Sequence, residues 1–327
     1  MASDLDIETI SRPVAEALRR FEAELVKQLQ TDVLVIQPIL NYLGSSPGKG
    51  LRPLLFFLAQ GLVKTPKPDS APLAAMLELL HTATLIHDDV VDQSLQRRGR
   101  RSLNALWGDR VSVLIGDYLF AKVLALGVEA EWKDVLRIVS KTVSDMGRGE
   151  LREELKDRNK LFTVEEYYAH IRDKTAGFFC AACEMGGLVV GAANSERDRL
   201  RRFGEKYGMI FQIRDDILDM TGHVDLLGKP IGQDVCNGRM TLPLILAMEG
   251  ISKKEERSLR RRLGSAASKA DSPWIRRFVE KRKGIEKAQQ AALQLADEAI
   301  QILHMFKASE YRDALEDLVK HDVVRDR

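Results

Sequence analysis

The sequence predicts an all-α protein, and two observations support this fold class. Apolar residues recur at helical spacing along almost the whole chain of 327 residues. We find no convincing run of strictly alternating apolar and polar residues bounded by turns. Hydrophobic residues make up 45% of the chain, enough to bury a sizeable core. We therefore expect many helices, rare or absent strands, and a single domain over residues 1–327.

Local signals mark several helix ends. Thr163, followed three residues later by Glu166, predicts a capping box, in which each side chain bonds the backbone N–H of the other residue. A serine followed closely by a proline predicts three more starts, at Ser11 with Pro13, Ser70 with Pro72, and Ser272 with Pro273. Glycines typical of helix ends stand at Gly44, Gly191 and Gly222.

Two glycine-rich segments, 44–50 and 222–239, interrupt the helical pattern and carry lysine or arginine. Loops of this composition can present backbone N–H groups and cations to phosphates. The charged segment 253–264 is interpreted as a solvated helix face.

The overall charge excludes a general attraction to nucleic acid or to anionic lipid. Lysine and arginine number 50 against 48 aspartates and glutamates, which leaves a net charge of +2. Any binding of phosphates must therefore come from local clusters of charge.

Three cysteines, Cys180, Cys183 and Cys236, are too few and too scattered for a disulfide framework. Cys180 and Cys183 form C-x-x-C, but no second pair of ligands follows, so a zinc or redox site is not expected. No apolar stretch reaches the length of a membrane span, and residues 1–11 lack the pattern of a signal segment. We expect a soluble protein of the cytoplasm.

Two matching aspartate clusters are the most specific feature of the sequence. DDVVD occupies residues 88–92 and DDILD residues 215–219, each inside an apolar helical run. On an α-helix, the first and last aspartates of a cluster lie one turn apart on the same side. Like charges at this spacing repel each other and need a compensating cation.

Mg²⁺ is the best candidate for that cation. It keeps several waters, uses one or two carboxylates and bridges to substrate phosphates. The sequence therefore predicts a magnesium-dependent enzyme that acts on diphosphates. For either cluster alone, helix acids that merely pair with nearby arginines remain the alternative.

Cations in sequence near the clusters exceed what the aspartates need once a metal is bound. This excess suits an anionic ligand with several oxygens. The residues are Arg97, Arg98, Arg100 and Arg101 after the first cluster, Lys229 and Arg239 after the second, and Lys49 and Arg52 in the segment 48–53.

These motifs together resemble those of the all-trans isoprenyl diphosphate synthases, also called polyprenyl synthetases. DDVVDQSLQRRG at 88–99 is similar to the family's DDxxD-x4-RRG, and FQIRDDILD at 211–219 to its second aspartate-rich motif. The resemblance continues through GKGLRP at 48–53, HTATLIHDD at 81–89, KTA at 174–176 and GKPIGQDVCNGRMTLP at 228–243.

Two positions depart from the family pattern. Arg239 stands where the family usually has lysine, which keeps the charge but changes its geometry. Gly149, Glu150 and Glu153 are similar to the family's GExxQ, with glutamate in place of the final glutamine. The role of Glu153 therefore cannot be carried over.

The resemblance implies an isoprenoid synthase fold, with long helices around a deep central cavity, and a homodimer. Asp88 and Asp92 would hold two Mg²⁺ ions and Asp215 a third, supported by Asp89, Asp216 and Asp219. Arg97, Lys174, Lys229 and Arg239 would bind the allylic diphosphate. Thr175 and Gln212 would direct side-chain oxygens at the allylic carbocation.

Isopentenyl diphosphate, the second substrate, would occupy a basic pocket formed by Lys49, Arg52, His81 and Arg98. A lone histidine on an apolar helix is more often a core residue. The family position of His81 favours binding, whereas His87 is interpreted as structural.

Product length is predicted from the helix that leads into the first cluster. Descending from Asp88 by turns of about 5.4 Å, the chain meets Thr84, then Leu80, then Met76 and Leu77, with Ala83 beside them. In the family, a bulky aromatic near this level often closes the cavity. Ala83 and Thr84 are small, so we expect a deeper floor, formed by Leu126 with Met76 or Leu77, and a product of thirty to fifty carbons.

Three alternatives stay open. A short-chain synthase would differ only in pocket depth, and product masses would distinguish it. A class I terpene cyclase would share DDxxD but would not need a second set of diphosphate-binding cations. A non-catalytic partner subunit that binds prenyl chains is disfavoured by the intact aspartates, and turnover by the isolated chain would exclude it.

Overall fold

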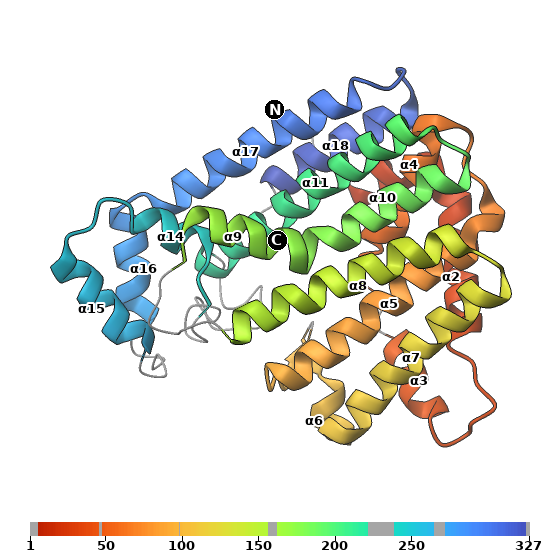
Figure 1. The fold of residues 1–327 in the computed structure, drawn as a ribbon, viewed down its shortest axis with the longest axis horizontal. Coiled ribbons are helices and arrows are strands. Elements are labelled where there is room, and N and C mark those ends of the chain that lie inside the picture. Colours follow the sequence, from red (N-terminus) through yellow and green to blue (C-terminus); the bar gives the residue numbers. More distant parts are fainter. Residues whose placement is uncertain are drawn as a thin grey trace. The chain divides into compact units, whose positions relative to one another are not determined.

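The computed structural model describes residues 6–45, 48–97, 99–155, 162–221, 239–264 and 272–324. Within these ranges the chain is almost entirely helical, which confirms the predicted fold class (Figure 1). The strands that these ranges contain, β1 (Gln96–Arg97) and β2 (Arg100–Arg101), form one antiparallel pair. Strands are therefore rare, as expected.

The chain divides into two compact units, each made of separate stretches of sequence. The first unit contains Met1–Lys141, Phe178–Gly204 and Leu303–Asp317, and the second contains Thr142–Gly177, Glu205–Ile302 and Leu318–Arg327. The first aspartate cluster belongs to the first unit and the second cluster to the second unit.

The N-terminal part of the chain contributes most helices of the first unit. Its central helix, α5 (Ala71–Val91), packs against α2, α4, α6 and α7 (Figure 1). Every residue of α5 from 73 to 80 is buried, so this half of the helix forms the core of the unit. The other elements are α1 (Ile7–Ser11), η1 (Arg12–Val14), α2 (Ala15–Gln28), α3 (Gln37–Gly44), α4 (Leu51–Val63), η2 (Pro68–Ser70), α6 (Leu103–Trp107) and α7 (Asp109–Glu129).

A second set of helices follows along the chain, and several of them build the second unit. Met220, Leu244, Ala247 and Val279 belong to a buried cluster of that unit, and α14 packs against α9 and α16. The elements are α8 (Lys133–Glu154), α9 (Val164–Ile171), η3 (Arg172–Ala176), α10 (Gly177–Val189), α11 (Asn194–Thr221), α14 (Leu242–Ala247), α15 (Lys253–Gly264), α16 (Ser272–Lys281), α17 (Gly284–Leu303) and α18 (Glu310–Val324).

The predicted helix ends hold with two qualifications. Thr163 and Glu166 form the capping box, and Gly191 follows the end of α10 with a positive φ of 73°. Ser11 ends α1 and also directly precedes η1, which has Pro13 near its start as predicted, but η1 is a three-residue 3₁₀ helix and the Ser11 side chain does not cap it. Ser70 precedes α5 as predicted, but its hydroxyl donates to the Lys67 carbonyl and accepts from Gln60 instead of capping. Gly222 lies outside the described residues.

One helix in the described part of the chain, α7, is long and apolar enough to cross a membrane by length and composition. A single helix of this kind is weak support for a membrane span, since core helices of globular proteins meet the same criterion. Here α7 packs along α5, and Gly116 makes this possible. A Cβ atom at position 116 would lie 2.1 Å from Nε2 of His87.

Candidate active site

The first aspartate cluster ends α5 and divides its carboxylates by burial. Asp89 is 4% exposed, whereas Asp88 is half-buried and Asp92 is exposed. Arg97 of β1 donates from Nε to both carboxylate oxygens of Asp89, at 2.8 and 2.9 Å, and its Nη2 lies 2.8 Å from Oδ1. This two-pronged ion pair attaches the β1–β2 hairpin to the end of α5.

The second cluster, on α11, shows the same division. Asp216 is 4% exposed, whereas Asp215 and Asp219 are half-buried. The carboxylate of Asp216 accepts hydrogen bonds from the Tyr167 hydroxyl at 2.7 Å and the Leu242 N–H at 3.0 Å. Burial, and then the neighbouring Asp216, raise the pKa of Tyr167 well above its usual value, so this hydroxyl stays a donor.

The donor set of both clusters fits Mg²⁺. In each, the second aspartate is buried and accepts hydrogen bonds from protein donors, and the first and last aspartates lie one turn apart on the helix and are less buried. Among the described residues, no group of three or more histidine, cysteine or acidic side chains is gathered into a ready-made metal site. Mg²⁺ does not need one, because it takes one or two carboxylates and completes its shell with water and substrate phosphate.

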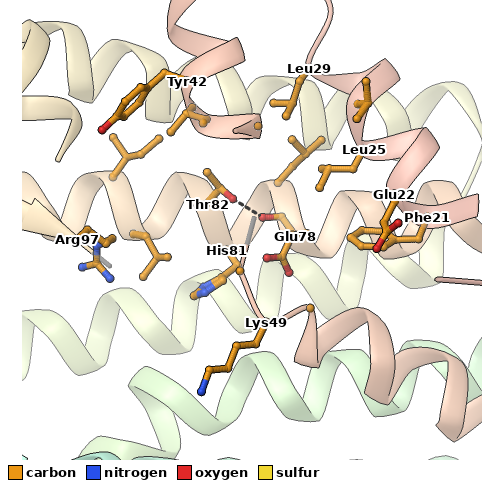
Figure 2. Close-up of a pocket in the computed structure, with 18 of the residues that line it drawn as sticks. Phe21, Glu22, Leu25, Leu29, Tyr42, Lys49, Glu78, His81, Thr82 and Arg97 are labelled. Atoms are coloured by element: carbon orange, nitrogen blue, oxygen red, sulfur yellow. Dashed lines mark hydrogen bonds between the residues drawn. The ribbon is translucent and has the colours of Figure 1, made fainter. Parts of the chain in front are cut away.

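A cavity of about 610 Å³ opens in the first unit beside α5. Figure 2 shows Phe21 and Leu25 of α2 at one end, Arg97 at the other, and His81 and Lys49 between them. The cavity therefore joins an apolar wall to cations that the sequence analysis assigned to diphosphate binding.

Three residues assigned to isopentenyl diphosphate lie in the first unit. Gly50 adopts a left-handed conformation, with φ at 62°, and immediately precedes α4, whose second residue is Arg52. The Arg52 guanidinium lies 4.8 Å from the ring centre of Phe179 and 5.5 Å from that of Phe178. His81 is 8% exposed, and its ring packs edge-on against Phe178. The aromatic pair thus restrains both Arg52 and His81. Arg98, the fourth assigned residue, lies outside the described residues.

Lys174 occupies a charged cluster in the second unit. Its Nζ lies 2.6 Å from a carboxylate oxygen of Glu150 and 3.2 Å from one of Glu153, and Glu153 lies 3.3 Å from Nε2 of His170. Burial disfavours the charged forms of both Lys174 and Glu153. For Lys174 the two glutamates outweigh burial and raise the pKa, and for Glu153 the charges of Lys174, His170 and Arg239 lower it. The raised pKa keeps the Lys174 amine protonated and positively charged.

The π-helical turn η3 carries both Lys174 and Thr175. Such turns occur often at functional sites. Thr175 Oγ1 donates to Oε1 of Gln212 at 2.8 Å, and Nε2 of Gln212 donates to Asp216 at 3.0 Å. The structure thus connects two residues predicted to face the carbocation. Arg239 lies near enough to Lys174 and Glu153 to influence their pKa values. Lys229 lies outside the described residues.

The residues assigned to product length are packed in the first unit. Ala83, Met76 and Leu77 are fully buried, Leu80 is 1% and Thr84 3% exposed, and Leu126 of α7 is half-buried. The 610 Å³ cavity is lined by other residues of α5, including Leu79, Thr82 and Leu85. The assigned stripe therefore lies on a different face of α5 from that cavity.

Sequence reasoning missed several residues that hold the site together. Tyr167 and His170 precede the KTA segment by one to two helical turns, so the helical spacing that places Lys174 could have found them. Arg100, which the sequence analysis counted only among the cations near the first cluster, donates to Ser45 and lies over the Tyr42 ring, and so connects the hairpin to the end of α3. Nε2 of His87 lies 3.1 Å from the Val113 carbonyl of α7.

Comparisons with known proteins agree with these features. The family model described as Polyprenyl synthetase matches residues 33–279. The chain is 31% identical to octaprenyl diphosphate synthase of Escherichia coli, over 99% of this chain and 100% of that protein. It is 34% identical to an all-trans-nonaprenyl-diphosphate synthase (geranyl-diphosphate specific) of Rhodobacter capsulatus, over 95% of each chain. The crystal structure of polyprenyl synthase from Caulobacter crescentus, complexed with calcium and isoprenyl diphosphate, superposes with a TM-score of 0.91 at 33% identity over 98% of both chains.

Proposed function

Because the chain belongs to the polyprenyl synthetase family and is a prenyltransferase, we propose that it adds isopentenyl diphosphate units head-to-tail to an allylic diphosphate. The proposed product is an all-trans chain of thirty to fifty carbons. Relatives whose names specify eight and nine isoprene units support this range.

One observation supports placing the active site at the two aspartate clusters: in both clusters the second aspartate is buried and the first and last are not. Asp88, Asp92, Asp215 and Asp219 are half-buried or exposed, whereas Asp89 and Asp216 are buried and accept hydrogen bonds from protein donors. We assign Mg²⁺ binding to the first group, with three ions per site, and support to the second. A relative crystallised with calcium and isoprenyl diphosphate is consistent with a divalent ion beside the diphosphate.

When bound, Mg²⁺ would offset the charge that develops on the departing diphosphate. The residues of the chain act around it. Lys174, Arg97, Lys229 and Arg239 bind the allylic diphosphate, and Lys49, Arg52, His81 and Arg98 bind isopentenyl diphosphate.

The reaction begins as the allylic C–O bond breaks and its electron pair leaves with the diphosphate. The double bond of isopentenyl diphosphate attacks the resulting cation, and a proton passes to the departed diphosphate. Thr175 and Gln212 direct oxygens at the cation, and apolar walls exclude water that would capture it. No protein nucleophile is required.

A homodimer is the proposed assembly. Helix α7 leaves Leu114, Leu124 and Val128 exposed at 66%, 54% and 66%, positions that recur along one side of the helix. Exposed apolar side chains on one side of a helix suit association with a second copy. Cys180 and Cys183 are thiols and not a disulfide, which suits the reducing environment of the cytoplasm, where we place the enzyme.

The decisive experiment incubates the purified chain with Mg²⁺, isopentenyl diphosphate and, separately, allylic primers of ten, fifteen and twenty carbons. Mass spectrometry of the products should show chains of thirty to fifty carbons. Products that stop at fifteen or twenty carbons would establish the short-chain alternative. Inactivity of the isolated chain, followed by activity with an added subunit, would support the non-catalytic alternative.

A further inference from the structure

Tyr167 and Asp216 form a buried, hydrogen-bonded pair of side chains that is connected to the two residues assigned to the allylic cation. Tyr167 comes from α9 and Asp216 from α11, and they are 3% and 4% exposed. The hydrogen bonds at Asp216 continue through Gln212 to Thr175. The four side chains form one network within the second unit.

The direction of these hydrogen bonds follows from the chemistry of the groups. A carboxylate has only acceptor sites, so the amide nitrogen of Gln212, and not its oxygen, must face Asp216. The amide oxygen then faces Thr175, whose single hydroxyl proton is donated to it. One N–H of Gln212 therefore points toward Asp216 and the hydroxyl proton of Thr175 points toward Gln212, so the Thr175 end of the network keeps oxygen lone pairs.

We infer that Asp216 and Tyr167 are positioning residues that orient Gln212 and Thr175 so that oxygen lone pairs, and not protons, face the allylic cation. This inference rests on the proposed function. An oxygen lone pair stabilises a developing positive charge, whereas an N–H or O–H pointing at it opposes the reaction.

The surroundings suit a positioning role. The N–H of Leu242, the first residue of α14, shares Oδ2 of Asp216 with the hydroxyl of Tyr167 from α9, so donors from two other helices hold this carboxylate. Since α9 begins with the capping box at Thr163, the position of Tyr167 is also fixed from its own helix. Buried and mutually supported polar groups of this kind keep a dipole in one orientation.

Tyr167→Phe tests the inference with little change in shape. We expect kcat to fall about tenfold, because one partner of the orienting carboxylate is lost. The KM values for both diphosphates and the Mg²⁺ concentration for half-maximal rate should not change. The matched control is Tyr168→Phe, which removes the same hydroxyl from the next residue of α9 and should leave kcat unchanged. Equal effects of the two variants would overturn the inference.

Asp216→Asn provides a second test, because asparagine keeps the shape but can donate as well as accept. The amide of Gln212 can then turn over, and kcat should fall about 100-fold with the Mg²⁺ requirement unchanged. A large increase in the Mg²⁺ requirement would instead identify Asp216 as a metal ligand and overturn its positioning role. Circular dichroism should show wild-type helix content for each variant.

A double-mutant cycle separates positioning from a general structural effect. In a Thr175→Val background there is no hydroxyl left to orient, so adding Tyr167→Phe should lower kcat much less than it does in the wild type. Effects that simply multiply would contradict the network. Absence of prenyltransferase activity in the wild-type protein is a different result, which would refute the proposed function and not the network alone.

Discussion

Asp89 and Asp216 are each only 4% exposed. Their burial and their hydrogen-bond donors distinguish them from the other aspartates of each cluster, to which we assign Mg²⁺. Each is held by side chains from another element, Asp89 by Arg97 and Asp216 by Tyr167. A buried carboxylate whose oxygens already accept hydrogen bonds from charged or polar protein groups has fewer lone pairs left to coordinate a metal ion. Asp88, Asp92, Asp215 and Asp219 are less buried, so we assign Mg²⁺ binding to them.

We expect Asp88→Ala or Asp215→Ala to lower turnover by about a thousandfold or more, because stabilisation of the leaving diphosphate is lost. The helical fold should remain, since neither residue is buried. Steady-state rates at saturating Mg²⁺ and circular dichroism measure both outcomes. Asp134→Ala, at an exposed aspartate of α8, is the control. Near-normal rates for either variant would refute the metal assignment.

The cluster around Lys174 predicts a pH dependence of stability. Burial lowers the pKa of His170 below 6.5, although Glu153 partly offsets this effect. Below pH 6.5 the unfolded chain therefore binds more protons at this position, and the free energy of unfolding should decrease as the pH falls. Glu153, whose pKa is lowered from 4.5, adds to the loss only at more acidic pH. Lys174, whose pKa is raised from 10.5, loses its contribution only at high pH.

Urea unfolding at pH 7, 6 and 5 measures this dependence. His170→Gln should reduce the decrease in stability between pH 7 and pH 5, because the titrating group is gone. His304→Gln, at a histidine whose side chain is 56% exposed, should leave the decrease unchanged. A His170→Gln variant with the wild-type pH profile would show that other groups cause the dependence.

At the scale of elements, helix α5 packs into the core of the first unit with one face and lines the cavity with another. One face carries Met76, Leu80 and Ala83 into the packed interior, and another lines the 610 Å³ cavity with Leu79 and Leu85. The same helix ends in the first aspartate cluster, so both faces belong to the element that carries the proposed metal ligands Asp88 and Asp92.

Ala83→Phe tests which face the growing chain follows. If the tail passes Ala83, a phenylalanine ring there should shift the main product to twenty carbons or fewer and leave the first condensation largely active. Ala74→Phe is the control, because Ala74 is also fully buried on α5 but lies farther from the cluster. Both variants should lose stability through overpacking, by about 1–3 kcal/mol. An unchanged product length with Ala83→Phe would move the chain-length role to another face.

At the scale of the whole molecule, the exposed apolar residues Leu114, Leu124 and Val128 of α7 are the interface that we propose for a homodimer. Leu124→Glu should weaken the homodimer and shift the protein toward a monomer, because a charge would be buried at the interface. Analytical ultracentrifugation measures the change. Leu293→Glu on α17 is the matched control, since Leu293 is 52% exposed and Leu124 54%. A wild-type monomer, or equal behaviour of both variants, would contradict the proposed interface.

The sequence by itself determined the helical fold class, the Thr163 capping box and the two aspartate clusters. These features depend on local periodicity and on contacts between residues a few positions apart. The family followed from the order of the motifs, and the comparisons confirm it.

Only the tertiary structure decided which carboxylates are buried and what holds them. Asp88 and Asp89 are adjacent and chemically identical in the sequence, yet Asp89 is buried and forms an ion pair with Arg97 of the β1–β2 hairpin, whereas Asp88 is half-buried. Asp216 meets Tyr167 across 49 positions of the chain. Burial and hydrogen bonding between distant residues depend on how the helices pack, and the helical repeat of a single segment does not encode that packing.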